Sequence, residues 1–234
     1  ENREVLLTSE FEPDVEAILE AVDANTKLLF LCSPNNPSGN SFNAELVKKL
    51  LESFNGLVVI DEAYTAFTDA DYLDWAVTYP NVVVMRTLSK VGLAGSRFGM
   101  LIGHPDWISE FEKTRLPYNI NILSQTAVQY ALEHASILNE QSQRIREERS
   151  RLTLGLSKRG FEVWPSEANF VVMGCRANQA RPLFDALKAH RILVKCLDGS
   201  HPRLKDTLRV TVGAPEETDA LLAALDHLAA EFGR

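Results

Sequence analysis

The sequence predicts an α/β fold, in which a mainly parallel sheet is followed by a smaller C-terminal α+β domain. Short apolar segments alternate with amphipathic helical segments in the first half, and the second half mixes both patterns. Strand–helix–strand alternation is typical of parallel sheets covered by helices. We expect the boundary in or near a long helical stretch, which gives domains at residues 1–140 and 141–234.

The first half contains two helical segments and four short apolar segments typical of strands. The helical segments span residues 14–23, just after Pro13, and residues 43–54, before an Asn-Gly stop. The strand segments are residues 27–32, 57–60, 81–86 and 99–103. Because helices cover both faces of a parallel sheet, residues 27–32 are expected to form a buried strand.

The second half begins with a long helical stretch at residues 121–159, which Gly160 ends. Polar residues 139–144 mark a solvent-facing part of this stretch or a bend in it. Four strand segments and two helical segments follow, at residues 161–164, 169–173, 192–196 and 208–212, and at 181–190 and 218–232. This mixture predicts the smaller α+β domain.

Composition excludes several classes of protein. Apolar residues make up 45% of the 234 residues, which is enough for a packed core. The net charge is −8 and no lysine or arginine cluster is dense, so nucleic-acid binding is disfavoured. No apolar run is long enough to span a membrane, and the first residues do not resemble a signal peptide. The three scattered cysteines indicate reduced thiols in a cytoplasmic protein, and neither they nor the histidines have metal-ligand spacing.

Candidate site residues lie directly after three of the predicted strands. Asn36 follows the first strand, Asp61 and Tyr64 follow the second, and Lys90 follows the third. Open α/β sheets place their ligands at the carboxyl ends of strands. A lysine in this setting suggests an amine that forms a Schiff base with an aldehyde cofactor.

Three motifs, at residues 33–39, 58–64 and 86–97, resemble those of the fold-type I aminotransferases that use pyridoxal 5′-phosphate (PLP). Within that family, the chain is most similar to the histidinol-phosphate aminotransferase group. The resemblance runs along essentially the whole chain, to residues 208–213. It implies that the first domain is part of a PLP-binding large domain whose N-terminal part is absent here.

The resemblance implies a role for each strand-end residue. Lys90 would hold PLP covalently and, once displaced by the substrate amine, would move a proton between the substrate Cα and the cofactor carbon. Asp61 would keep the pyridine nitrogen protonated, which makes the ring an electron sink. Tyr64 and Asn36 would contact the ring oxygen O3′. The alternatives are a surface lysine, a turn aspartate, a packed aromatic ring and an Asn-Pro turn.

The resemblance also implies two anion sites. Thr87, Ser89 and Arg97 would bind the cofactor phosphate through two hydroxyls and a guanidinium. Arg209, in the second domain, would clamp the substrate carboxylate. A structural ion pair is the alternative for Arg97, and a solvent-facing side chain is the alternative for Arg209.

The chain departs from the family pattern in two ways. Lys90 and Arg97 are seven residues apart, one fewer than in many members, and Gly92 and Gly95 would absorb the deletion. The family also has an N-terminal stretch, with a Gly-rich phosphate-binding turn and a stacking aromatic, before the point where this chain begins. We therefore expect a piece of a longer enzyme, and a truncated relative that holds PLP poorly is the alternative.

The resemblance implies an aminotransferase that moves an amino group between an amino donor, first of all L-histidinol phosphate, and a 2-oxo acid such as 2-oxoglutarate. It also implies a homodimer. An aromatic aminotransferase and a PLP-dependent threonine-phosphate decarboxylase-like enzyme are alternatives on the same fold. An alternative of another class is a truncated, non-catalytic dimerising module.

Overall fold

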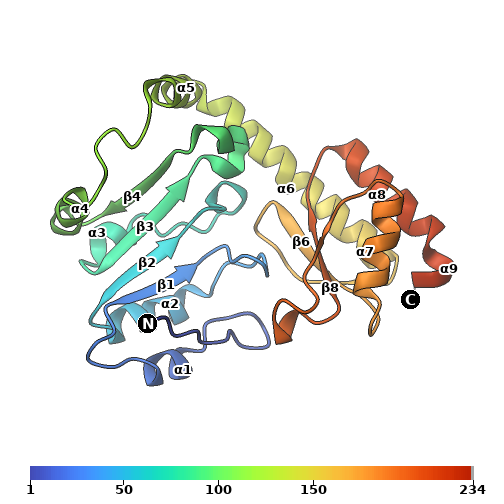
Figure 1. Cartoon of the computed structure of the whole chain (residues 1–234), viewed down its shortest axis with the longest axis horizontal. Helices are drawn as coiled ribbons and strands as arrows, with labels where there is room; N and C mark the ends of the chain where they lie inside the picture. The colour runs from blue at the N-terminus through green and yellow to red at the C-terminus, as the bar shows by residue number, and fades with distance from the viewer. Residues whose placement is uncertain (233–234) are drawn as a thin grey trace. The chain divides into compact units, whose positions relative to one another are not determined.

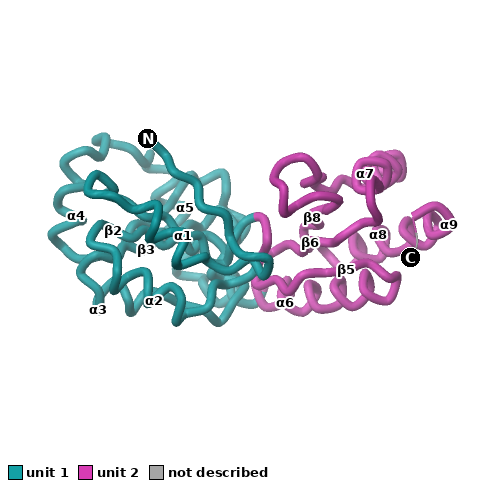
Figure 2. The backbone as a smooth tube through the Cα atoms, turned by 90° about the horizontal axis from the view of Figure 1, so that it is seen from below, with its two compact units in different colours: residues 1–36, 40–140 teal, residues 37–39, 141–234 magenta. Residues whose placement is uncertain are grey.

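Residues 1–232 are described in a computed structural model of the chain (Figure 1). They form two compact units, shown in two colours in Figure 2. Unit 1 contains residues 1–36 and 40–140, and unit 2 contains residues 37–39 and the chain from 141 onward. The change of unit after residue 140 falls within helix α6 (Ala135–Lys158). That either unit folds as a domain on its own stays a prediction.

Unit 1 contains a four-stranded sheet in the order β1-β2-β3-β4 (Figure 1). The strands are β1 (Leu28–Cys32), β2 (Leu57–Asp61), β3 (Val82–Thr87) and β4 (Gly99–Gly103). The first three strands pair in parallel, and β4 is antiparallel to β3. The predicted mainly parallel sheet is confirmed, and its three parallel strands end at the same edge.

Three helices pack on one face of this sheet. They are α1 (Val15–Glu20), α2 (Ala44–Ser53) and the short α3 (Trp75–Thr78). Asp14 and Asn43 begin α1 and α2, because each side chain accepts a hydrogen bond from a backbone N–H of the first turn. Buried side chains from these helices and from β1, β2 and β3 form one core cluster.

The opposite face of the sheet is covered less completely. Leu57, Val59 and Val83 are buried there, against Phe111 of α4 (Pro105–Glu112). In the parallel register Leu28 and Phe30 lie beside Leu57 and Val59, yet they are 50% and 63% exposed. The expectation of a strand buried on both faces is therefore wrong for β1 within the described residues, because this face of β1 lacks a covering helix.

The long helical stretch is two helices rather than one. Helix α5 (Ile122–Glu133) ends at His134, and α6 begins at the next residue. The ring Nδ1 of His134 lies 2.8 Å from the carbonyl oxygen of Tyr130. The backbone N–H of His134 donates to the Ala131 carbonyl rather than to that of Tyr130. This side-chain competition for a helix carbonyl explains the break. Residues 139–144 lie inside α6 and all but Ser142 are exposed, so the prediction of a solvent-facing part is confirmed.

Unit 2 has an antiparallel sheet in the order β5-β6-β8-β7. Its strands are β5 (Glu162–Val163), β6 (Phe170–Gly174), β7 (Lys195–Cys196) and β8 (Thr207–Thr211). Helices α6, α7 (Ala180–Ala189) and α8 (Pro215–His227) contribute leucines to its core, and α9 (Ala229–Phe232) contributes Phe232. The predicted α+β arrangement is confirmed, although the strand expected at residues 192–196 is only two residues long.

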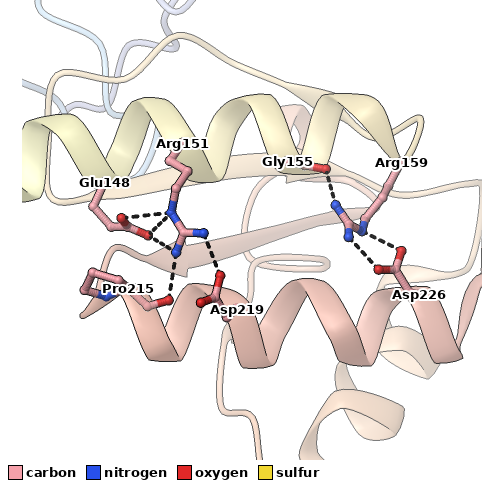
Figure 3. A network of polar contacts seen from close by, with 7 residues as sticks. All are labelled: Glu148, Arg151, Gly155, Arg159, Pro215, Asp219 and Asp226. Atoms are coloured by element: carbon pink, nitrogen blue, oxygen red, sulfur yellow. Dashed lines mark hydrogen bonds and ion pairs between the residues drawn. The ribbon is translucent and has the colours of Figure 1, made fainter.

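Two arginines of α6 bind acidic residues of unit 2 (Figure 3). Arg151 donates through Nε to both carboxylate oxygens of Glu148 at 3.0 Å and through Nη1 to Asp219 at 2.6 Å. Arg159 binds both oxygens of Asp226, at 2.6 and 2.8 Å, and holds the pKa of that carboxyl below its usual range. These contacts orient α8 against α6, but solvent screens them, so their contribution to stability is small.

Candidate active site

The carboxyl ends of the parallel strands bring the predicted residues of unit 1 to one edge of the sheet. Cys32 ends β1 and Asp61 ends β2, and the two residues are opposite each other in the register. Paired residues of neighbouring strands project from the same face. Their side chains therefore lie on the face opposite the cluster that α1, α2 and α3 cover.

Lys90 lies in a wide turn after β3, the η2 segment Ser89–Leu93. Its Nζ is 5.2 Å from the centroid of the Tyr64 ring, within the range of a cation–π contact. Tyr64 is buried, and the η1 turn (Thr65–Phe67) that follows it is anchored by the fully buried Phe67. Gly92 has a φ of 93°, which favours glycine, and that it absorbs the deletion stays a prediction.

Cys32 ends β1, and its thiol interacts with several groups of the candidate site. Burial, together with the charge of Asp61, raises the pKa of Cys32 to about 11. A hydrogen bond from the Asn36 backbone and the charge of Lys90 act in the opposite direction. The backbone of Asn36 therefore binds the Cys32 thiol, and the charges of Asp61 and Lys90 act on it. From the sequence Cys32 is predicted only to be a reduced thiol, although its place at a strand end was a usable signal.

This environment predicts slow alkylation of Cys32. With a pKa of about 11, the folded protein at pH 8 holds on the order of a hundredfold less thiolate at Cys32 than an ordinary cysteine. Iodoacetamide labelling, quantified by peptide mass spectrometry from pH 7 upward, should show a rate that keeps rising through the pH range where ordinary thiols level off. The same peptide in urea is the control and should titrate as an ordinary thiol, and equal profiles in both states would contradict the prediction.

Thr87 and Ser89 come together at the end of β3. The Thr87 hydroxyl oxygen is 2.8 Å from Ser89 Oγ and 3.1 Å from the Phe98 carbonyl oxygen, and it accepts the Ser89 N–H at 3.0 Å. Arg97 immediately precedes Phe98, is exposed and has a φ of 52°. The structure thus brings the backbone of Arg97 beside the two hydroxyls.

Arg209 belongs to unit 2, whereas the other predicted site residues belong to unit 1. It lies on β8, opposite Val172 of β6 in the register. Its guanidinium carbon is 4.8 Å from the centroid of the Phe170 ring, and the side chain is half-buried. Arg209 therefore packs on an aromatic ring rather than simply pointing into solvent.

The fold is that of an α/β protein, and these residues form a candidate site around Lys90 at the carboxyl edge of its parallel strands. The chain belongs to the family of class I and II aminotransferases, whose family model matches residues 2–225.

Curated relatives include histidinol-phosphate aminotransferases. The chain is 43% identical to histidinol-phosphate aminotransferase 2 of Nitrosococcus oceani, over 94% of this chain and 62% of that protein. It is also 43% identical to the histidinol-phosphate aminotransferase of Chromobacterium violaceum, over 95% of this chain and 63% of that protein. The chain thus spans less than two thirds of the length of these relatives.

Solved structures agree with this placement. The histidinol-phosphate aminotransferase of Sinorhizobium meliloti, solved in complex with pyridoxal 5′-phosphate, superposes with a TM-score of 0.86 at 30% identity. The match covers 97% of this chain and 63% of that one. The enzyme of the same name from Clostridium acetobutylicum, at 24% identity and a TM-score of 0.87, shows the shared fold, covering 96% of this chain and 70% of its own. Within residues 1–232, no helix has the length and apolar character needed to cross a membrane.

Proposed function

We propose that this chain forms the lysine-bearing part of a PLP-dependent aminotransferase. The observation that carries the proposal is the position of Lys90. Its Nζ lies 5.2 Å from the centroid of the Tyr64 ring, at the edge of the sheet where Asp61 ends β2. The likeness to histidinol-phosphate aminotransferases at 43% identity supports it.

The side chains at this edge fit the chemical groups of PLP. An amine suits an aldehyde, a carboxylate suits a protonated pyridine nitrogen, and two hydroxyls with a guanidinium suit a phosphate. Lys90, Asp61, and the set Thr87, Ser89 and Arg97 provide these partners in turn. When bound, PLP supplies a ring that withdraws electrons from the bond that is broken at the substrate Cα.

Each side chain has a defined task in this proposal. Lys90 would hold PLP at its aldehyde carbon through Nζ and, once displaced by the substrate amine, would move a proton at the substrate Cα. Asp61 holds a proton on the pyridine nitrogen. Tyr64 packs beneath the lysine and, with Asn36, orients the cofactor ring through its O3′ oxygen. Arg209 binds the carboxylate of the 2-oxo acid.

The proposed amino donor is L-histidinol phosphate, and the proposed acceptor is 2-oxoglutarate. The names of the relatives support this choice. A homodimer and a cytoplasmic location are also part of the proposal and rest on the family likeness. Multi-angle light scattering of the purified chain tests the first of these.

Reductive trapping tests the cofactor site. The chain is mixed with PLP and reduced with borohydride, and the labelled peptide is mapped by mass spectrometry. We expect a phosphopyridoxyl group on the peptide that contains Lys90, with far less label on the exposed Lys188 and Lys158. Label spread equally over the lysines, or none at Lys90 in a folded chain, would contradict the proposal for this chain and favour the non-catalytic alternative.

A donor panel tests the reaction. L-Histidinol phosphate, phenylalanine and O-phospho-L-threonine are each supplied with 2-oxoglutarate, and glutamate and CO₂ are measured. We expect glutamate from L-histidinol phosphate. Release of CO₂ from O-phospho-L-threonine without glutamate would favour the decarboxylase alternative.

A further inference from the structure

A buried carboxylate and a partly buried arginine form an ion pair directly behind the candidate site. Glu62 follows Asp61, and its side chain is 0% exposed. Arg86 donates through Nε to Glu62 Oε2 at 2.7 Å and through Nη2 to Asp71 Oδ1 at 2.7 Å. Burying a charged carboxylate is unfavourable unless it is paired. Burial away from water raises the pKa of Glu62. Neither the fold nor the proposed reaction explains why this charge is kept there.

The pair lies on the other face of the sheet from the site. Successive residues of a strand project to opposite faces, so Asp61 and Glu62 point apart, as do Thr87 and Arg86. The Glu62 N–H donates to the Met85 carbonyl at 2.8 Å, which extends the ladder between β2 and β3 to their carboxyl ends. The ion pair spans the same two strand ends from behind.

The same carboxylate also reaches the end of β1, through Tyr72. Glu62 Oε1 accepts the Tyr72 N–H at 2.6 Å, and the Tyr72 hydroxyl donates to the Phe42 carbonyl at 3.1 Å. The Phe42 N–H in turn donates to Oγ of Ser33, the residue that follows Cys32. One buried carboxylate is thus connected to all three strand ends that carry the site.

We propose that Glu62 and Arg86 are positioning residues, which fix the strand ends carrying Asp61 and Lys90 without touching the cofactor. The proposal rests on the proposed function for its consequence and on the contacts above for its geometry. Removing Arg86 leaves the fully buried Glu62 carboxylate without a counter-charge, which is strongly unfavourable. Removing the charge of Glu62 leaves Arg86 held by Asp71 alone, so in both cases the ends of β2 and β3 lose the ion pair that joins them.

The first test needs no cofactor. The variant is Glu62→Gln, which keeps the shape of the side chain and removes its charge. Glu148→Gln is the matched control, because the Glu148 side chain is 10% exposed and Arg151 binds it through Nε in the same way. Hydrogen–deuterium exchange should rise about fivefold or more in the peptides that cover residues 33–42, 61–72 and 86–93 of Glu62→Gln, and not elsewhere in the chain. Unchanged exchange in those peptides, or an equal rise throughout the chain, would overturn the positioning role.

The second test measures the dissociation constant for PLP below the unfolding temperature of each variant. We expect Glu62→Gln to weaken binding about tenfold, in the range typical of groups that orient a ligand-binding residue, and Glu148→Gln to leave it unchanged. Arg86→Lys should retain more affinity than Arg86→Met. Faster exchange at the strand ends with unchanged PLP affinity would also overturn the proposal. If the unaltered chain takes up no PLP, the proposed function fails, while the exchange measurement still decides whether the pair holds the strand ends.

A milder variant covers the case in which Glu62→Gln does not fold. Asp71 is 55% exposed and holds the outer side of Arg86, so Asp71→Asn loosens the pair without burying a lone charge. The same peptides should then exchange about twofold faster, because Arg86 loses one of its two anchors. No change in this variant would overturn the proposal.

Discussion

Replacing Lys90 with alanine should abolish the phosphopyridoxyl label at residue 90 and lower the rate of amino transfer about 10²–10⁴-fold. Alanine has no amine to bind the aldehyde and no base to move a proton at the substrate Cα. The rest of the turn should persist, because Gly92 adopts its left-handed conformation without the lysine and the Thr87–Ser89 contacts do not involve Lys90. Borohydride trapping with peptide mapping measures the label, and glutamate formation measures the rate.

The matched control is Lys188→Ala, since Lys188 is exposed near the end of α7 in unit 2. It should label and react as the unaltered chain does. A Lys90→Ala variant that still takes the label near residue 90, or that transfers amino groups at an undiminished rate, would move the cofactor site elsewhere in the chain.

Replacing Leu208 with alanine should lower the free energy of unfolding by about 2–5 kcal/mol. Leu208 is 0% exposed and lies on β8 between Met173 of β6 and Cys196 of β7. Its side chain joins the core of unit 2, whereas its neighbour Arg209 projects to the other face. Truncation therefore leaves a cavity in a packed layer without removing the guanidinium.

Leu193→Ala is the control for this substitution, because Leu193 is in the same unit and 79% exposed. Its effect should stay within about 0.5 kcal/mol. Urea denaturation followed by far-UV circular dichroism gives both values, and the Leu208 variant should shift the midpoint without changing the slope. Equal midpoints for the two variants would show that β8 does not anchor the core as described.

The periodicity of apolar residues located most helices and strands, because that periodicity arises from residues close together in the sequence. Asn43 and Gly160 set helix ends, and both effects are local. The exposure of Phe30 could not be predicted, since it depends on which segment covers that face. The break at His134 depends on a ring nitrogen that competes for a carbonyl, and a hydrophobic pattern carries no trace of it.

The candidate site was predictable to the extent that strand ends were. Asp61 and Lys90 stand out because polar residues follow apolar runs. Predicting that Cys32 lies beside Asp61 required knowledge of the strand register, which pairs the two residues. The pairing of Glu62 with Arg86 required knowing that β2 and β3 are neighbours, which a single sequence does not state. For Glu62 and Arg86 the available signal was a charged residue next to or within an apolar strand.

The alternation of Asp61 and Glu62 has a consequence for protein engineering. The two residues are consecutive, yet they serve opposite faces of one sheet. Copying only the ligand-facing side chains onto another α/β scaffold would transplant half of the arrangement. A successful graft would have to carry the acid, the arginine and the tyrosine of the reverse face as well, and the recipient would need a helical layer that can enclose them.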